Sequence, residues 1–149
     1  MEQKKKSITI LMADDDPDDR FMTQEAFNEA KLMNDFRFVE DGEELMDYLY
    51  QRGKYSDPKS APRPGIILLD LNMPRKDGRE VLSETKADAN LRRIPVVILT
   101  TSKEEEDIIH AYNLGSNSYI TKPVSFKELV VIIKSLASYW LEIVQLPDY

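Results

Sequence analysis

Residues 66–70 read Ile-Ile-Leu-Leu-Asp, a short run of apolar side chains that a single acid ends. The run does not alternate between apolar and polar positions, as a strand with one face in water would. Continuous runs of this kind are typical of strands in parallel sheets, where helices cover both faces. We therefore predict a buried strand at 66–69, with Asp70 at its carboxyl end.

Similar runs recur along the chain, and an amphipathic stretch follows each of them. The predicted strands are 8–13, 36–39, 66–69, 95–100 and 118–121, and the predicted helices are 18–31, 42–51, 77–86, 104–114 and 125 to about 140. Alternation of strands and helices indicates a parallel sheet with helices on both faces. Because such crossovers are right-handed, only a few doubly wound strand orders remain. The predicted fold class is α/β, with a doubly wound five-stranded parallel sheet.

The composition excludes several classes of protein. The 149 residues include 20 basic and 27 acidic side chains, so the formal net charge is −7. We expect no nucleic-acid partner, because nucleic-acid binding needs a basic face. There are no cysteines, which excludes disulfide scaffolds, thiolate metal sites and thiol catalysis. A single histidine, His110, excludes a histidine-rich metal site.

No apolar run approaches the ~18 residues of a membrane span. The apolar stretch behind the basic start is also too short for the core of a signal peptide. We therefore expect a protein of the cytoplasm without a membrane segment. The length is that of one domain, which we take as 1–149 with a core of about 7–138.

Two segments are additional to the alternating strands and helices. Residues 52–64 form a Pro-rich insert with four basic side chains, expected at the end of the sheet away from the strands' carboxyl ends. Residues 139–149 form an apolar extension whose large side chains are Trp140, Leu141, Ile143, Val144 and Leu146. These side chains either form the surface of a homodimer or fold back onto their own domain. The sequence leaves both possibilities open.

Four of the predicted strands deliver polar or charged side chains to one edge of the sheet. They are Asp14, Asp15, Asp16, Asp18 and Asp19 after the first strand, Asp70 after the third, Thr100 to Ser102 at the end of the fourth, and Lys122 after the fifth. Ligands of open α/β sheets bind at this edge, outside the strands' carboxyl ends. Helix capping explains one or two of the acids at 14–19, but not five acids in six residues.

Carboxylates that lie close together repel one another unless a cation compensates their charge. A hard divalent cation such as Mg²⁺ takes oxygen ligands and keeps room for a phosphate. The Lys122 ammonium is suited to phosphate oxygens, and Thr100 adds a hydroxyl donor. Asp70 is the candidate nucleophile, since a carboxylate can form an acyl phosphate. The pattern therefore predicts a Mg²⁺-dependent site for a phosphoryl group.

These residues resemble the receiver domain of the response regulators of two-component signalling. The resemblance covers Ile8 to Leu136. It rests on the acids at 14–19, on Asp70-Leu71-Asn72-Met73-Pro74 with Asp77-Gly78, on Thr100 and on Lys122-Pro123. Within that family the chain is similar to single-domain regulators associated with phytochromes, which share the insert, the run 74–82 and an aromatic tail. The resemblance implies a flavodoxin-like sheet with strand order 2-1-3-4-5.

The resemblance also implies a role for each acid at the sheet edge. Asp70 would accept a phosphoryl group from the phosphohistidine of a sensor histidine kinase or a histidine phosphotransfer protein. Asp14, Asp15, Asp70 and the backbone carbonyl of Asn72 would hold Mg²⁺, with Asp15 a direct ligand and Asp14 acting largely through water. Such a protein is not an enzyme with turnover, because it catalyses only its own phosphorylation and dephosphorylation.

The remaining residues would bind the phosphoryl group and report its presence. Lys122 and Thr100 would contact the phosphoryl oxygens, and Tyr119 would turn inward when Thr100 moves. Ordinary core packing is the alternative explanation for Tyr119. Only nine residues follow Trp140, so we expect no DNA-binding module and an output through a downstream protein target.

A phosphatase is the alternative function. Asp14-Asp15-Asp16 also resembles the start of haloacid-dehalogenase-like Mg²⁺-dependent phosphatases, with Asp14 as nucleophile and Asp16 as general acid. Against it, no acidic pair follows Lys122, and Asp70 would have no role. A flavin-binding flavodoxin is excluded, because five carboxylates stand where its phosphate loop needs hydroxyls and glycines.

Overall fold

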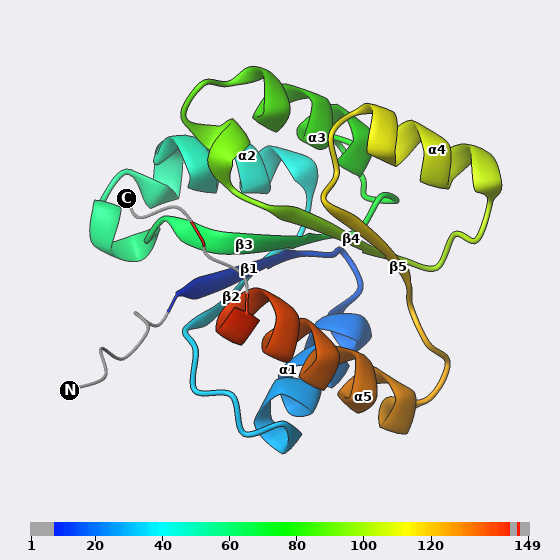
Figure 1. Ribbon diagram of the computed structural model, residues 1–149. Helices are drawn as coiled ribbons and strands as arrows, with labels where there is room; N and C mark the ends of the chain where they lie inside the picture. The colour runs from blue at the N-terminus through cyan, green and yellow to red at the C-terminus, as the bar shows by residue number, and fades with distance from the viewer. Residues whose placement is uncertain (1–7, 144–145, 147–149) are drawn as a thin grey trace.

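A five-stranded sheet with the order β2-β1-β3-β4-β5 forms the centre of the molecule (Figure 1). The structure, a computed structural model, describes residues 8–143 and 146, with only the main chain at 141–143. The strands are β1 Thr9–Ala13, β2 Phe36–Val39, β3 Pro64–Leu69, β4 Val96–Thr100 and β5 Ser118–Thr121. Every neighbouring pair runs parallel. The predicted fold class and strand order are therefore confirmed.

Helices cover both faces of the sheet, α1 and α5 on one and α2, α3 and α4 on the other (Figure 1). Their bounds are α1 Pro17–Glu29, α2 Gly42–Tyr50, α3 Gly78–Ala87, α4 Glu105–Asn113 and α5 Phe126–Leu136. Side-chain oxygens of Asp16, Asp41, Asp77 and Ser125 accept hydrogen bonds from the first turns of their helices. At the start of α5, the Ser125 hydroxyl accepts from the N–H of Glu128 at 3.1 Å.

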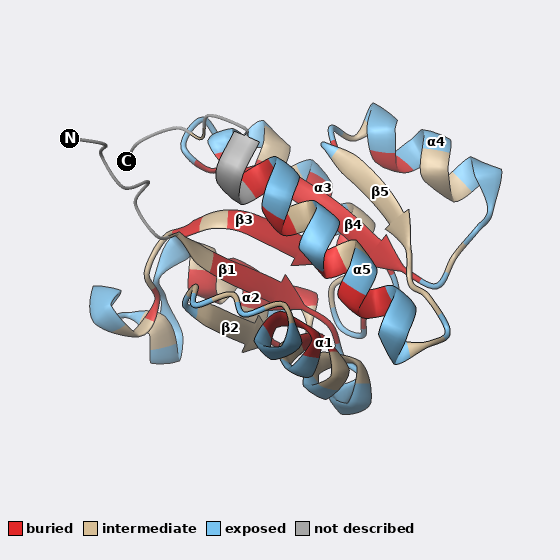
Figure 2. Cartoon of the chain, turned by 60° about the horizontal axis from the view of Figure 1, so that its bottom comes forward, coloured by how far each residue is buried: buried red, intermediate tan, exposed pale blue. Residues whose placement is uncertain are grey.

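The strands β1, β3 and β4 are buried on both faces, which explains their continuous apolar runs, whereas the edge strands β2 and β5 are mostly half-buried (Figure 2). Alternate residues of β1 and β3 belong to two separate core clusters. Leu11, Ala13, Ile67 and Leu69 pack with α2 and α3, whereas Ile10, Met12, Ile66 and Leu68 pack with α1 and α5. The acids at the carboxyl ends of these strands are therefore carried by the buried, close-packed centre of the sheet.

The last helix differs from the prediction. The α-helix ends at Leu136, and the chain continues as a wider π-helix, Ala137–Ile143. An apolar pattern over one or two turns does not distinguish the two helix types, because both bring residues three to five apart onto one face.

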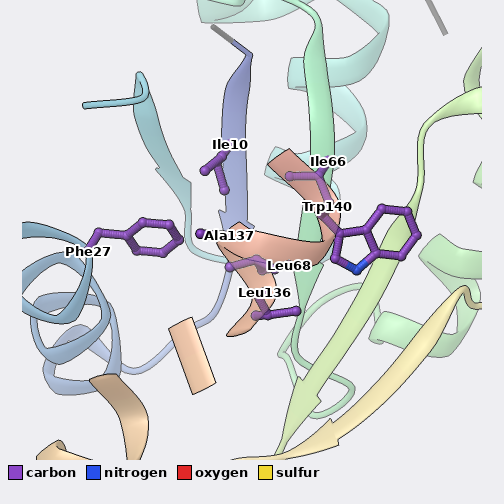
Figure 3. Close-up of a pocket in the computed structure, with 7 residues that line it drawn as sticks. All are labelled: Ile10, Phe27, Ile66, Leu68, Leu136, Ala137 and Trp140. Carbon is purple, nitrogen blue, oxygen red and sulfur yellow. The ribbon is translucent and has the colours of Figure 1, made fainter. Parts of the chain in front are cut away.

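Two large side chains of the apolar extension, Trp140 and Leu146, pack against their own domain. Trp140 is only 8% exposed and lies in the cluster beneath α1 and α5, beside an apolar gap of about 10 Å³ (Figure 3). Leu146 packs against the same cluster. The Trp140 side chain is thus not available as an exposed dimer surface, whereas Leu146 is half-buried. The side chains of Leu141 and Ile143, and the whole of Val144, lie outside the described residues.

The Pro-rich insert forms two short 3-10 helices, Gly53–Tyr55 and Pro58–Ser60, before β3 begins at Pro64. The Tyr48 hydroxyl donates to the carbonyl of Pro62 at 2.7 Å, which ties the insert to α2. The insert lies at the amino ends of the strands, away from the edge that carries the acids (Figure 1). In the described part of the chain, no helix is long and apolar enough to cross a bilayer.

Candidate functional site

The sheet ladder brings the predicted site residues to one edge. Hydrogen bonds between neighbouring strands continue one residue beyond the strand ends: the N–H of Asp14 donates to Val39 at 3.1 Å, that of Asp70 to Ala13 at 3.0 Å, and that of Lys122 to Thr100 at 2.7 Å. These bonds fix the backbone from which each functional side chain projects. The convergence expected from strand order is thus built by main-chain geometry.

Asp70 lies at the centre of this edge and is 8% exposed. Its Oδ1 accepts hydrogen bonds from the Thr100 hydroxyl at 2.9 Å and from the N–H of Asn72 at 3.2 Å. Its Oδ2 accepts from the Lys122 ammonium at 3.2 Å. A carboxylate with donors on both oxygens is held in one orientation, and the same donors could contact the oxygens of a group bound to it.

Asp14, Asp15 and Asp70 form a ligand set that fits a divalent cation. One carboxylate oxygen from each residue lies within 4.8 Å of the other two. Asp14 is fully buried and Asp15 is exposed, so a cation here would contact both protein and solvent. Burial raises the pKa of Asp14, although hydrogen bonds from Lys122 and from the N–H of Asp16 partly offset that rise.

Lys122 compensates the negative charge of this edge. Its Nζ lies 2.6 Å from Asp14, 2.7 Å from Asp19 and 3.2 Å from Asp70. Burial lowers the pKa of Lys122, but the hydrogen bonds with Asp14 and Asp19 and the charge of Asp70 outweigh it, so the pKa lies above the ordinary value. The carboxylates still outnumber this one ammonium, which leaves the edge negative and favours a further cation.

The contact between Lys122 and Asp19 was not predicted from the sequence. Asp19 was one member of an acidic run, and nothing in the run distinguishes the acid that faces Lys122 from those that face water. The spacing of Asp19 from the start of α1 could have predicted this contact. Asp19 follows the cap of α1 by three residues, and this places it in the first helical turn, from which its side chain reaches the edge.

The acids in the loop after β1 have different hydrogen-bond partners and therefore different structural roles. Asp16 is exposed, and its Oδ1 accepts hydrogen bonds from the N–H groups of Asp18 at 2.9 Å and Asp19 at 3.4 Å, as a helix cap does. Arg20 donates to the carbonyl of Asp14 at 2.7 Å and so fixes the loop. The phosphatase alternative requires Asp16 as the general acid. The structure uses Asp16 to cap α1 instead.

The loop after β3 approaches the site closely because it contains a glycine. The N–H of Gly78 donates to the carbonyl of Leu71 at 3.0 Å. A Cβ atom at Gly78 would lie 2.3 Å from the carbonyl oxygen of Asp70, a distance that no side chain tolerates. Gly78 therefore lets α3 begin directly against the backbone of Asp70.

Tyr119 connects β5 to the loop that follows Thr100. Its ring packs partly buried against the core, and its hydroxyl donates to the carbonyl of Ser102 at 3.1 Å. The packing of the ring agrees with the core explanation for Tyr119, and the hydroxyl adds a polar contact with the segment next to Thr100. Ser102 was not predicted as a partner.

Comparison with known proteins places this geometry in a family. The sequence model of the response regulator receiver domain matches residues 10–134. The response regulator Rcp1 of Synechocystis sp. (strain ATCC 27184 / PCC 6803 / Kazusa) is 44% identical over 138 residues, 93% of this chain and 92% of that protein.

Two solved structures are similar over nearly the whole chain. The crystal structure of the phosphorylated cyanobacterial phytochrome response regulator RcpA has a TM-score of 0.89 at 44% identity, covering 96% of this chain and 100% of RcpA. The Mn²⁺-bound form of Rcp1 has a TM-score of 0.85 at 42% identity, covering 95% of this chain and 99% of Rcp1. The chain therefore belongs to the response regulator receiver domain family, and within it resembles phytochrome-associated response regulators.

Proposed function

We propose that Asp70 accepts a phosphoryl group in a Mg²⁺-dependent reaction. The single observation that carries this proposal is the environment of Asp70. Its carboxylate contacts the Thr100 hydroxyl and the Lys122 ammonium, and it shares a ligand set with Asp14 and Asp15. The donor would be the phosphohistidine of a sensor histidine kinase or a histidine phosphotransfer protein, as the family implies.

The proposed transfer forms one bond and breaks another. An oxygen of Asp70 attacks the phosphorus, the bond from phosphorus to the histidine nitrogen breaks, and the imidazole leaves with the electron pair and takes up a proton. Mg²⁺, held by Asp14, Asp15, Asp70 and the carbonyl of Asn72, would supply positive charge to the carboxylates and phosphoryl oxygens. The chain's own contribution is to orient Asp70 and to hold the phosphoryl oxygens with an ammonium and a hydroxyl.

We further propose that the phosphoryl group changes a protein-binding surface. Charge on Asp70 would favour conformers that bring Thr100 and Lys122 closer to it. Tyr119, bonded to the loop next to Thr100, would then turn inward. The surface around α4 and β5 would bind a downstream protein target. Catalysis would be limited to the protein's own phosphorylation and dephosphorylation.

The related proteins support the proposal through their own ligands. RcpA has been solved in a phosphorylated form and Rcp1 in a Mn²⁺-bound form. RcpA is a cyanobacterial phytochrome response regulator, which supports a phytochrome kinase as the partner of this chain. The acid set at Asp14, Asp15 and Asp70 is compatible with Mg²⁺ as with Mn²⁺, because both take carboxylate oxygens.

Intact-protein mass spectrometry tests the proposed function. The protein is incubated with acetyl phosphate, a small phosphoryl donor, with Mg²⁺ or with a chelator. We expect one phosphoryl adduct that forms only with Mg²⁺. A folded protein that stays unlabelled with both acetyl phosphate and a phosphorylated histidine kinase would contradict the proposal.

The metal assignment predicts a difference between two acids that lie close in sequence. Asp15→Ala removes one of the three grouped carboxylates and should weaken Mg²⁺ binding by about tenfold or more. Glu25→Ala removes the same charge from the exposed face of α1 and should leave the affinity nearly unchanged. Isothermal titration of Mg²⁺ into both variants measures the two affinities. Equal affinities would exclude Asp15 as a ligand.

A further inference from the structure

The loop between β4 and α4 is held by hydrogen bonds that lie outside the acidic edge. The Ser102 hydroxyl donates to Asp107 Oδ2 at 2.7 Å and accepts from the N–H of Glu104 at 3.3 Å. The Ser102 carbonyl accepts the Tyr119 hydroxyl at 3.1 Å. Ser102 is two residues beyond Thr100, so these bonds fix the main chain that carries the Thr100 hydroxyl to Asp70.

Arg79 connects this loop to the helix that begins at the phosphoacceptor. Its guanidinium donates to Asp107 Oδ1 at 2.8 Å and lies 3.2 Å from Asp77, the cap of α3. The side chains of Arg79 and Asp107 are 25% and 27% exposed, so solvent screens the pair only in part. Because α3 starts directly against the backbone of Asp70, Arg79 has a fixed position relative to that residue.

Helix α4 has little apolar packing of its own. Ala111 is its one buried residue, and Ile109 and Tyr112 are each about half exposed. The cap residue Glu104 makes no side-chain capping bond. Segments with few buried contacts open most easily. The polar link from Arg79 to Asp107 directly connects α3 with the start of α4.

The hydrogen bonds that join Arg79, Asp107 and Ser102 depend on one another. Asp107 accepts hydrogen bonds from Ser102 and Arg79 at once, one on each carboxylate oxygen, and these bonds hold its pKa below its usual range. Removing Arg79 would leave Asp107 free to turn toward solvent and would release the Ser102 hydroxyl. The loop after Thr100 would then sample other positions, and the Thr100 hydroxyl would contact Asp70 for a smaller fraction of the time.

We propose that Arg79 is a positioning residue for the phosphoryl site. Through Asp107 and Ser102 it holds the loop after Thr100 in the arrangement in which Thr100 contacts Asp70 and Tyr119 contacts Ser102. The inference rests on the proposed function, because it assigns Arg79 to the control of the phosphoacceptor Asp70. Arg79 itself touches neither the phosphoacceptor nor the grouped metal ligands in the bonds described.

Binding of beryllium trifluoride, a mimic of a phosphoryl group on a carboxylate, tests the inference. When only a fraction of the protein is competent to bind, the apparent dissociation constant rises by the inverse of that fraction. We expect Arg79→Gln to weaken beryllium trifluoride binding in saturating Mg²⁺ by about fivefold, the low end of site-to-site coupling, because the pair is partly exposed. The affinity for Mg²⁺ alone should not change.

Matched variants separate positioning from general damage. Arg75→Gln removes the same charge from an exposed arginine that faces Asp41 and Glu43, and should bind like wild type. Asp107→Asn should weaken binding as Arg79→Gln does, and the double variant should be no worse than either single variant. Arg79→Lys should restore part of the affinity, since an ammonium can still donate to Asp107. In NMR spectra, the signals of Thr100 and of the Tyr119 ring should shift in Arg79→Gln.

The outcomes distinguish the two proposals. Wild-type affinity for beryllium trifluoride in both Arg79→Gln and Asp107→Asn would overturn the positioning role and leave the proposed function standing. Weakened Mg²⁺ binding together with a lowered melting temperature would also overturn it, because that result indicates structural damage. If wild-type protein itself fails to bind beryllium trifluoride, the proposed function fails, and the inference fails with it.

Discussion

Replacing Asp70 by Asn should abolish the Mg²⁺-dependent phosphoryl adduct and leave the protein folded. An amide is not a nucleophile toward phosphorus, whereas a carboxylate forms an acyl phosphate. The side chain keeps its shape, and an amide oxygen can still accept the bond from Thr100. Lys122 keeps Asp14 and Asp19 as partners. Intact-protein mass spectrometry after incubation with acetyl phosphate and Mg²⁺ measures the adduct, and thermal melting followed by circular dichroism reports the fold.

Asp16→Asn is the matched control for this experiment. Asp16 is an exposed acid of the same edge, and asparagine caps helices as well as aspartate does. We expect this variant to form the adduct like wild type. Stoichiometric labelling of Asp70→Asn would move the acceptor to another residue. Loss of labelling in Asp16→Asn alone would favour the phosphatase alternative.

Replacing Trp140 by Ala should destabilise the protein by about 3–5 kcal/mol, the usual cost of emptying a large aromatic site in a core. The indole is 8% exposed and shares a cluster with side chains of β1, β3, α1 and α5 (Figure 3). The gap beside it is only about 10 Å³, so the surrounding side chains are already close and an empty site would be large. Urea denaturation measures the free energy of unfolding.

Tyr139→Ala is the control for Trp140→Ala. The Tyr139 ring contacts the Trp140 ring at a centroid distance of 5.4 Å but is 54% exposed. Its loss should cost about 1 kcal/mol or less. Similar small losses in both variants would show that the extension does not cover its own domain. A changed oligomeric mass in Trp140→Ala with unchanged stability would instead support the dimer surface.

The sheet and its functional edge could be predicted because both follow from local patterns. Continuous apolar runs such as 66–69 occur where a strand is buried on both faces, and the residue after each run then falls at the carboxyl edge. Asp14, Asp70, Thr100 and Lys122 meet there for that reason alone. Their order along the chain, with the resemblance to receiver domains, was enough to predict that these side chains lie together.

The contacts between side chains of different elements could not be predicted in the same way. Asp19 with Lys122, Tyr119 with Ser102, and Arg79 with Asp107 join residues 17 to 103 positions apart. Each pair depends on side-chain direction and loop path, which periodicity does not specify. The position of the C-terminal extension could not be predicted either. An apolar pattern is equally compatible with an extension that packs on its own domain and with one that packs on a second copy of the chain.

Reduction of the phosphorylated protein tests the central claim most directly. Borohydride reduces an acyl phosphate to an alcohol and leaves carboxylates and the phosphate esters of serine and threonine unchanged. Protein labelled with acetyl phosphate and Mg²⁺ is reduced and digested, and the modified peptide is sequenced by mass spectrometry. We expect Asp70 to be converted to the alcohol, homoserine. Conversion at Asp14 or at any other carboxylate in place of Asp70, or a phosphate that resists reduction, would contradict the account.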